Sequence, residues 1–516
     1  MHLNAENRES KFRGSISDKL GMLHAVIWFL FCVTVYAYWR TVCRRRNIKL
    51  PSPPDLPRRL PFIGHAHIFF GDSLHAWKVI KWLSKETDKR GGVASISMGP
   101  HKGFCVTDPD DCLTISNVCL KKDYYYSFAT PWLGNGLLTG SVATWRLHRR
   151  LLGPAFSQRV LNGFISAFNC KSRALVTQLE DRVGRGPFDH VPYLSFNNLE
   201  TICQTALGIK MEDHSAVNQQ YEQALHDIFA VLTERFQKFW LHYDFVYNRT
   251  KLKEREDQII KVLHNMSNTA LQQRKSVFLQ EHDAASDKPT DKSKTFIDII
   301  LETCGGAFSD KDVREEVDNI IFAGHDTIST VLTTALSLLG SHPDVQDKVY
   351  NEVRRVLGDA ERDVTKEDYL RLEYLEAVLK ESMRMYPVAP VIARYSDAEV
   401  KLKNYTAPAG SGFILLLWGV HQHRIWGADA DQFRPERWLE AATLPDPSFF
   451  AGFSTGRRSC IGKVYAMMSM KTTLSFLLRR YRVSSDVTDL EFKLEAILRP
   501  HRGHYIAIER RSKDDK

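Results

Sequence analysis

The sequence predicts a mainly α-helical protein with a small β portion, an α+β fold in which one large domain follows a single N-terminal transmembrane helix. Three observations lead to this prediction. Residues 20–39 contain no Asp, Glu, Lys or Arg. Apolar residues recur at helical spacing over long stretches, whereas runs with strand character are fewer and shorter. Beyond residue 62 there is no second Pro/Gly/Ser-rich linker and no repeat, so one domain is favoured over the roughly three that the chain length would allow.

The N-terminal region divides into three predicted segments. Residues 1–19 form a polar extension, to which we assign no role. Residues 20–39, at about 1.5 Å each, span roughly 30 Å, which is the thickness of a hydrocarbon core, so they are predicted to be a transmembrane anchor. Basic residues follow this stretch, whereas those before it are nearly offset by acidic ones, which places the C-terminal side in the cytosol. Residues 40–62 form a basic and proline-rich hinge, predicted to be a stiff spacer.

Composition narrows the class of protein. The chain is 43% hydrophobic and 25% charged, which excludes fibrous and mostly disordered proteins. Its net charge of +9 fits either a solvated basic surface or a face that meets anionic lipid or an acidic partner. Nucleic acid is not an expected partner, because no basic run is interleaved with aromatic residues. The nine cysteines are odd in number and include no CxxC pair, so a reducing compartment fits better than a disulfide framework or a zinc finger.

The remaining elements are predicted along residues 63–516, the expected catalytic domain. Helical spacing is found over 161–183, 215–238, 251–279, 311–339, 344–357 and 464–478. Strand-like runs are 93–98, 103–107 and 412–418. The polar stretch 281–294 is predicted to be a surface loop between helices.

Cys460 stands out among the cysteines. It lies in a polar, Gly-rich loop just before an apolar helix, with Gly456 and Gly462 on either side and Arg458 close by. Glycines let the backbone approach a planar ligand closely. The N-terminal end of a helix favours thiolate over thiol, and thiolate is the form that binds metal. From these residues alone, Cys460 is either a reactive or ligating cysteine or a structural loop thiol.

The spacing of this loop resembles that of a known family. Phe453-x-x-Gly456-x-Arg458-x-Cys460-x-Gly462 is similar to the haem loop of the cytochrome P-450 superfamily at every defined position. The resemblance implies a haem-thiolate monooxygenase domain in which Cys460 ligates the iron of haem b.

Further motifs of that family follow, and the roles below are those that the resemblance implies. Glu381 and Arg384, three residues apart on a helix, meet Arg437 of a downstream segment and support the haem loop. Ala323, Gly324, Asp326 and Thr327 lie in a long helix that widens locally over the haem, where Asp326 and Thr327 relay protons to dioxygen. His325 packs or forms hydrogen bonds rather than ligating iron.

The resemblance also implies a set of haem contacts. Trp145 and Arg149 donate to a haem propionate, and Arg458 is another partner of the propionates, with Arg394 as a weaker candidate. The sequence from Glu316 to Thr327 is similar to the central-helix motif of family 4 and its clan, several families of which are expanded in insects. Many family 4 members carry, at the position of Ala323, a Glu that forms an ester with haem, so we predict non-covalent haem here.

The implied function is hydroxylation or epoxidation of a hydrophobic small molecule, such as a fatty acid, terpenoid, hormone or xenobiotic. Dioxygen is the second substrate, and electrons come from NADPH through a membrane-bound cytochrome reductase, with cytochrome b5 as a further donor, since no flavin domain is present. The implied location is the endoplasmic reticulum membrane, with the catalytic domain on the cytosolic side. Alternatives are a reductase-independent peroxide isomerase or dehydratase on the same fold and a catalytically silent haem or lipid carrier. A group of aromatic residues is expected near the pocket, although such residues also occur in cores: Tyr124, Tyr125, Tyr126 and Phe128.

Overall fold

The protein is described by a computed structural model, which covers residues 24, 26–37, 52–99, 101–208, 219–284, 294–303, 307–358, 361–440, 442 and 444–511. The chain divides into two compact units, Met1–Ser52 with Asn404–Thr406 and Pro53–Lys403 with Ala407–Lys516.

The first unit contains the predicted anchor. Residues 24 and 26–37 are helical and exposed. Within the part of the chain that the structure describes, no helix combines the length and apolar character needed to cross a bilayer. The other residues of the predicted anchor, the extension 1–19 and residues 40–51 of the hinge lie outside the described residues.

Residues 53–62 of the expected hinge belong to the second unit. The backbone N–H of Leu56 donates to the carbonyl of Ser95 at 3.0 Å, and the N–H of Ser95 donates to the carbonyl of Pro54 at 2.8 Å. The Leu56 side chain is buried. Burial of this apolar side chain and the pairing of backbone groups favour packing over an extended spacer.

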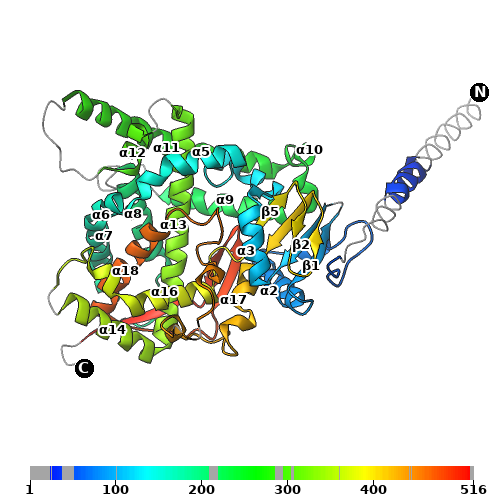
Figure 1. The fold of residues 1–516 in the computed structure, drawn as a ribbon. Helices are drawn as coiled ribbons and strands as arrows, with labels where there is room; N and C mark the ends of the chain where they lie inside the picture. Colours follow the sequence, from blue (N-terminus) through cyan, green and yellow to red (C-terminus); the bar gives the residue numbers. More distant parts are fainter. Residues whose placement is uncertain are drawn as a thin grey trace, which may run out of the picture. The chain divides into compact units, whose positions relative to one another are not determined.

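The second unit is mainly helical (Figure 1). Its longer helices are α2 (Ser73–Asp88), α3 (Pro109–Val118), α5 (Val142–Leu152), α7 (Ile165–Leu179), α8 (Val191–Ile202), α9 (Gln219–Gln237), α11 (Lys251–Ala284), α12 (Phe296–Thr303), α13 (Asp310–Ser341), α14 (Pro343–Leu357), α16 (Glu373–Met385) and α18 (Lys463–Arg480). Short helices are α4 (Thr130–Leu133), α6 (Gln158–Gly163), α10 (Asp244–Tyr247), α15 (Asp368–Arg371) and α17 (Leu417–His421), with 3-10 turns that include η1 (Ala66–Phe69) and η2 (Tyr124–Ala129).

The strands form small sheets. One has the order β1-β2-β8-β5-β3, in which only β2 and β8 run parallel, and another has the order β4-β12-β9. Strands β10 and β11 form an antiparallel pair. The strands are β1 (Val93–Met98), β2 (His101–Val106), β3 (Lys121–Lys122), β4 (Phe188–Asp189), β5 (Ile392–Ser396), β6 (Val400–Lys401), β7 (Thr406–Ala407), β8 (Ser411–Leu415), β9 (Tyr481–Ser484), β10 (Glu491–Glu495), β11 (Ile497–Arg502) and β12 (Tyr505–Arg510).

The mainly helical prediction with a small β portion is confirmed, and three element predictions are wrong in part. The loop expected over 281–294 begins later, because α11 continues to Ala284. The stretch 161–183 divides into α6 and α7, because α6 ends at Gly163, and glycine disfavours a helix interior. The strand expected over 412–418 ends at Leu415, and α17 follows at once. Burial alternates within β8 and becomes continuous over Leu415, Leu416 and Leu417, and a short apolar run of this kind does not distinguish strand from helix by sequence. Residues 215–218 and 285–293 of the predicted elements lie outside the described residues.

Helix α13 is the central element of the helical part. It begins with a capping box between Ser309 and Asp312, and its side chains are buried on all sides over most of its second half. In Figure 1 it runs between the α6, α7 and α18 region and the sheet that contains β1, β2 and β5. Residues on α13 can therefore face both the helical core and the sheet.

Candidate haem and oxygen site

The loop that carries Cys460 is held by backbone hydrogen bonds just ahead of α18. The N–H of Cys460 donates to the carbonyl of Phe453 at 2.9 Å. Gly456 has φ +70°, and a Cβ there would lie 2.6 Å from the backbone of Ser116 in α3. The sequence predicts that this glycine lets the backbone approach a ligand. In the structure it is required because the loop backbone packs closely against α3. A Cβ on Gly462 would meet nothing closer than 3.8 Å.

The Cys460 side chain lines an internal cavity. The surface of this side chain is accessible, yet burial raises the pKa of its thiol. The two findings agree if the accessible surface faces the cavity, which Cys460 lines. The backbone of Gly462 and the charges of Arg149 and Lys463 lower the pKa, but burial has the larger effect. The expectation that the helix end leaves thiolate favoured is therefore wrong for the free thiol, although a coordinated metal deprotonates such a thiol outright.

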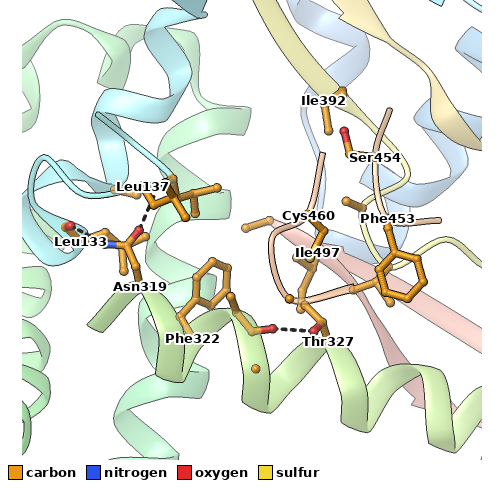
Figure 2. A pocket seen from close by; sticks show the side chains of 18 of the residues that line it. Leu133, Leu137, Asn319, Phe322, Thr327, Ile392, Phe453, Ser454, Cys460 and Ile497 are labelled. Carbon is orange, nitrogen blue, oxygen red and sulfur yellow. Dashed lines mark hydrogen bonds between the residues drawn. The ribbon is translucent and has the colours of Figure 1, made fainter. Parts of the chain in front are cut away.

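The cavity has a volume of about 560 Å³ and a mostly apolar lining. Figure 2 shows Cys460 and Phe453 of the loop above helix α13, which carries Thr327, Phe322 and Asn319. Nine of the predicted site residues line this cavity: Trp145, Arg149, Ala323, Gly324, Thr327, Phe453, Arg458, Cys460 and Gly462. Of the predicted aromatic group, Tyr125, Tyr126 and Phe128 line it and Tyr124 does not.

Buried cations gather beside Cys460. Burial and Arg394 lower the pKa of the Arg458 guanidinium to about 10, and burial together with Arg394 and Arg458 lowers the pKa of Lys122 well below its usual value. Nε and Nη1 of Arg458 and Nε of Arg394 are buried without a hydrogen-bond partner. Lys122 and Arg394 are adjacent on paired strands β3 and β5. Buried donors without a partner and neighbouring positive charges form a site suited to an anionic group. The two propionates of haem would supply the negative charge.

The expected propionate helix α5 also contacts the Cys460 loop. Nη1 of Arg149 donates to the carbonyl of Ser459 at 3.0 Å. The guanidinium of Arg458 lies 4.7 Å from the centre of the Trp145 ring, and its Nη2 donates to the carbonyl of Gly140 at 3.1 Å. The side chains that could hold haem therefore come from α5, β3, β5 and the Cys460 loop.

Helix α13 supplies the opposite wall. Thr327 Oγ1 donates to the carbonyl of Ala323 at 2.6 Å (Figure 2). A Cβ on Gly324 would lie 2.6 Å from Ile202 Cδ1, so this glycine allows close packing against α8. The helix is a continuous α-helix through these residues, which corrects the expected local widening. The threonine hydroxyl therefore bonds back to a carbonyl one turn earlier without interrupting the helix.

Asp326 does not line the cavity with Thr327. Its carboxylate forms a buried ion pair with Arg499 of β11, in which Nε donates at 3.1 Å and Nη2 forms a second contact. His325 also turns away from the cavity, and its Nε2 lies 3.0 Å from Ser195 Oγ. The two residues predicted to relay protons are thus adjacent in sequence but face different surroundings.

The predicted supporting cluster comes together in the core. Glu381 accepts two bonds from Arg384 and one from Arg437, each at 2.9 Å. Arg384 also donates to the carbonyl of His421, whose Nε2 accepts from the N–H of Ala451 at 2.9 Å. His421 thereby links this cluster to the segment that leads to Cys460.

Sequence reasoning missed several residues of the site. Lys122 and His421 belong to no motif in the sequence. Each interacts with residues far away in the chain, Lys122 with Arg394 and Arg458 and His421 with Ala451. Glu316 lines the cavity, and its carboxylate contacts His148 Nδ1 of α5. The motif 316–327 contains Glu316, so this residue could have been found.

Comparison with known proteins agrees with this geometry. A sequence model of the cytochrome P450 family matches residues 53–508, and the chain belongs to this family. It is a cytochrome P450 monooxygenase, whose family implies a haem-thiolate cofactor, dioxygen and an electron-donating reductase.

Its relatives carry family 4 names. Cytochrome P450 4g15 of Drosophila melanogaster is 30% identical, with 96% of this chain and 98% of the relative covered. Probable cytochrome P450 4s3 of the same organism is 34% identical over 79% and 83%. Cytochrome P450 4V2 of Mus musculus is 31% identical over 91% and 92%.

Proposed function

We propose that this monooxygenase binds haem b non-covalently through Cys460 and hydroxylates or epoxidises a hydrophobic small molecule. The observation that carries the proposal is a mostly apolar cavity with the Cys460 side chain on one wall and Thr327 on another. Ala323 has no carboxylate with which to form an ester to haem.

The residues have distinct roles in this proposal. Haem iron with a thiolate ligand supplies dioxygen activation when bound. Arg458, Arg394, Trp145 and Arg149 hold the propionates. Apolar side chains exclude water and position the substrate.

The proton relay uses Thr327 and Asp326. Thr327 Oγ1 donates to Ala323 and keeps lone pairs that can accept a hydrogen bond in the cavity. The Asp326 carboxylate is held by Arg499, so its exchange of a proton with Thr327 requires this ion pair to open.

The surface around the Cys460 loop fits an acidic reductase. Arg146, Arg150, Arg457 and Lys463 are exposed on α5, the loop and the start of α18. Leu147 and Val464 are exposed among them. Arg146→Glu should slow reduction by NADPH and reductase while leaving reduction by dithionite unchanged. Equal slowing of both would contradict docking at this face.

The endoplasmic reticulum location is proposed from residues 20–39. The full chain should sediment with microsomes and resist carbonate extraction, with the haem domain accessible to protease from the cytosolic side. A full chain released by carbonate would contradict the anchor.

The function itself is tested by reconstitution. The full chain, with NADPH, reductase and oxygen-18 dioxygen, should convert an apolar compound to a product carrying one labelled oxygen. Turnover of a hydroperoxide without NADPH would favour the isomerase or dehydratase. Haem and ligand binding with no turnover would favour the silent carrier.

A further inference from the structure

The charged groups of the cavity lining are unevenly placed. Among the described residues, the lining contains four cations, Lys122, Arg149, Arg394 and Arg458. Burial, Arg394 and Arg458 lower the pKa of Lys122, and burial and Arg394 lower the pKa of Arg458. Arg149 donates to the Ser459 carbonyl next to Cys460. Arg458 lies in the Cys460 loop and Arg149 contacts that loop, while Lys122 and Arg394 are paired on β3 and β5 near Arg458. The proposed function assigns all four to the haem propionates.

The rest of the described lining has no cation. It comes from many elements, among them α2, α8, α9, α13, α18 and the strands β5, β8, β10 and β11, and it is mostly apolar. The carboxylate in this lining is that of Glu316, which contacts His148 Nδ1 and supplies no positive charge to a ligand. A negatively charged ligand would find no counter-charge outside the haem contacts.

Several neutral polar groups in this lining already have hydrogen-bond partners, whereas Thr233 Oγ1 is buried without one. The Asn319 amide donates to the carbonyl of Leu133 and accepts from the N–H of Leu138. Thr205 bonds to a helical carbonyl and a tyrosine hydroxyl, and Gln237 donates to a main-chain carbonyl. Each of these groups is less available to solvate a ligand carboxylate.

We infer that the substrate is an uncharged lipophile, such as a hydrocarbon, terpenoid, alcohol or ester, and that the cavity discriminates against carboxylates of the same length. This inference rests on the proposed function, because it assigns the four cations to haem. An ionised carboxylate moved from water into an apolar cavity without a partner loses its hydration and gains no ion pair.

The test compares dodecanol with laurate on the haem-loaded full chain at pH 7.5. Binding is measured by Soret titration and by calorimetry, so that binding without a spectral change is counted. Dodecanol should bind about 100-fold tighter than laurate, since an unpaired buried charge costs at least the equivalent of two pKa units. Laurate that binds as tightly as dodecanol would overturn the inference.

The pH dependence gives a second measurement that needs no variant. The affinity for laurate should rise about tenfold for each pH unit by which the pH is lowered from 8 to 6, because the neutral acid is the form that binds. Dodecanol affinity should stay flat and controls for titration of the protein. A flat laurate profile would contradict the inference.

Adding a cation should change the preference. Thr233 lines the cavity on α9, and its buried Oγ1 has no hydrogen-bond partner. Thr233→Lys should strengthen laurate binding about tenfold or more by supplying an ion pair, whereas Thr233→Met, of similar length, should not. No gain of laurate binding in a folded Thr233→Lys protein would count against the inference.

A carbon monoxide difference spectrum of the same preparation separates the two proposals. If the thiolate-type band is present and laurate binds as tightly as dodecanol, the inference alone fails. If that band is absent, the proposed function fails and the inference fails with it.

Discussion

Replacing Glu381 with Gln tests the buried cluster that supports the Cys460 loop. Glu381, Arg384 and Arg437 are buried, with Glu381 and Arg384 each 0% exposed. The carboxylate also accepts from Trp438 Nε1 at 2.9 Å and from the N–H of Arg434 at 3.1 Å. Glu381→Gln removes the charge that offsets two guanidinium groups and turns an NH₂ toward their donors.

The expected loss follows from this burial. Breaking a buried ion pair on one side costs about 3–5 kcal/mol, because the remaining charge is left uncompensated. A whole domain is stable by only about 5–15 kcal/mol, so the variant should unfold at much lower denaturant and retain less haem.

The assay is urea unfolding followed by tryptophan fluorescence, together with the ratio of Soret to protein absorbance. Glu373→Gln is the matched control, since this residue is exposed on the same helix α16 and should change stability by less than about 0.5 kcal/mol. If Glu381→Gln were as mild as its control, the cluster would not be structural and the reasoning would be refuted.

Four further predictions follow from the site. Arg458→Ala should weaken haem retention about tenfold or more, measured by haem transfer to apomyoglobin, because a charge-assisted hydrogen bond is lost. Arg457 is exposed, so Arg457→Ala should leave retention unchanged, and equal effects of the two variants would contradict the assignment of Arg458 to a propionate. Thr327→Ala should divert NADPH electrons from product to hydrogen peroxide. Thr334 is buried on the same helix, and Thr334→Ala should leave the ratio of product to NADPH consumed unchanged. An unchanged ratio in Thr327→Ala would contradict the relay role. Burial and Arg384 lower the pKa of His421 to about 3, so the unfolded state binds more protons than the folded state between about pH 3 and 6.5. Stability should therefore fall on acidification through this range by up to about 1.4 kcal/mol per pH unit. His421→Gln, which can still accept from the N–H of Ala451, should lose that slope, and a variant with the same pH profile as the parent would contradict this role of His421. Acidified organic solvent should extract all haem from the polypeptide, and haem that stays bound would disprove the non-covalent prediction.

Local motifs explain how much of the site could be predicted. Cys460, Gly456 and Gly462 lie within one loop, and Glu381 and Arg384 lie one helical turn apart, so spacing alone brings them together. Hydrophobic periodicity likewise predicted α13 and α14 to within a few residues, because these helices carry regular apolar patterns.

Distant contacts could not be predicted in this way. Asp326 pairs with Arg499, which lies on a strand near the end of the chain. Lys122 reaches the cation group through the pairing of β3 with β5, and His421 reaches Ala451 through folding of the loop. Such pairs depend on tertiary packing, for which residue spacing carries no signal.

The carbon monoxide difference spectrum of the dithionite-reduced full chain tests the central claim most directly, with Cys460→Ser as the matched variant. A thiolate ligand from Cys460 predicts a strongly red-shifted Soret band in the parent protein and its loss in the variant. An unshifted band in the parent protein, or a red-shifted band that persists in Cys460→Ser, would contradict the assignment of Cys460 as the haem ligand.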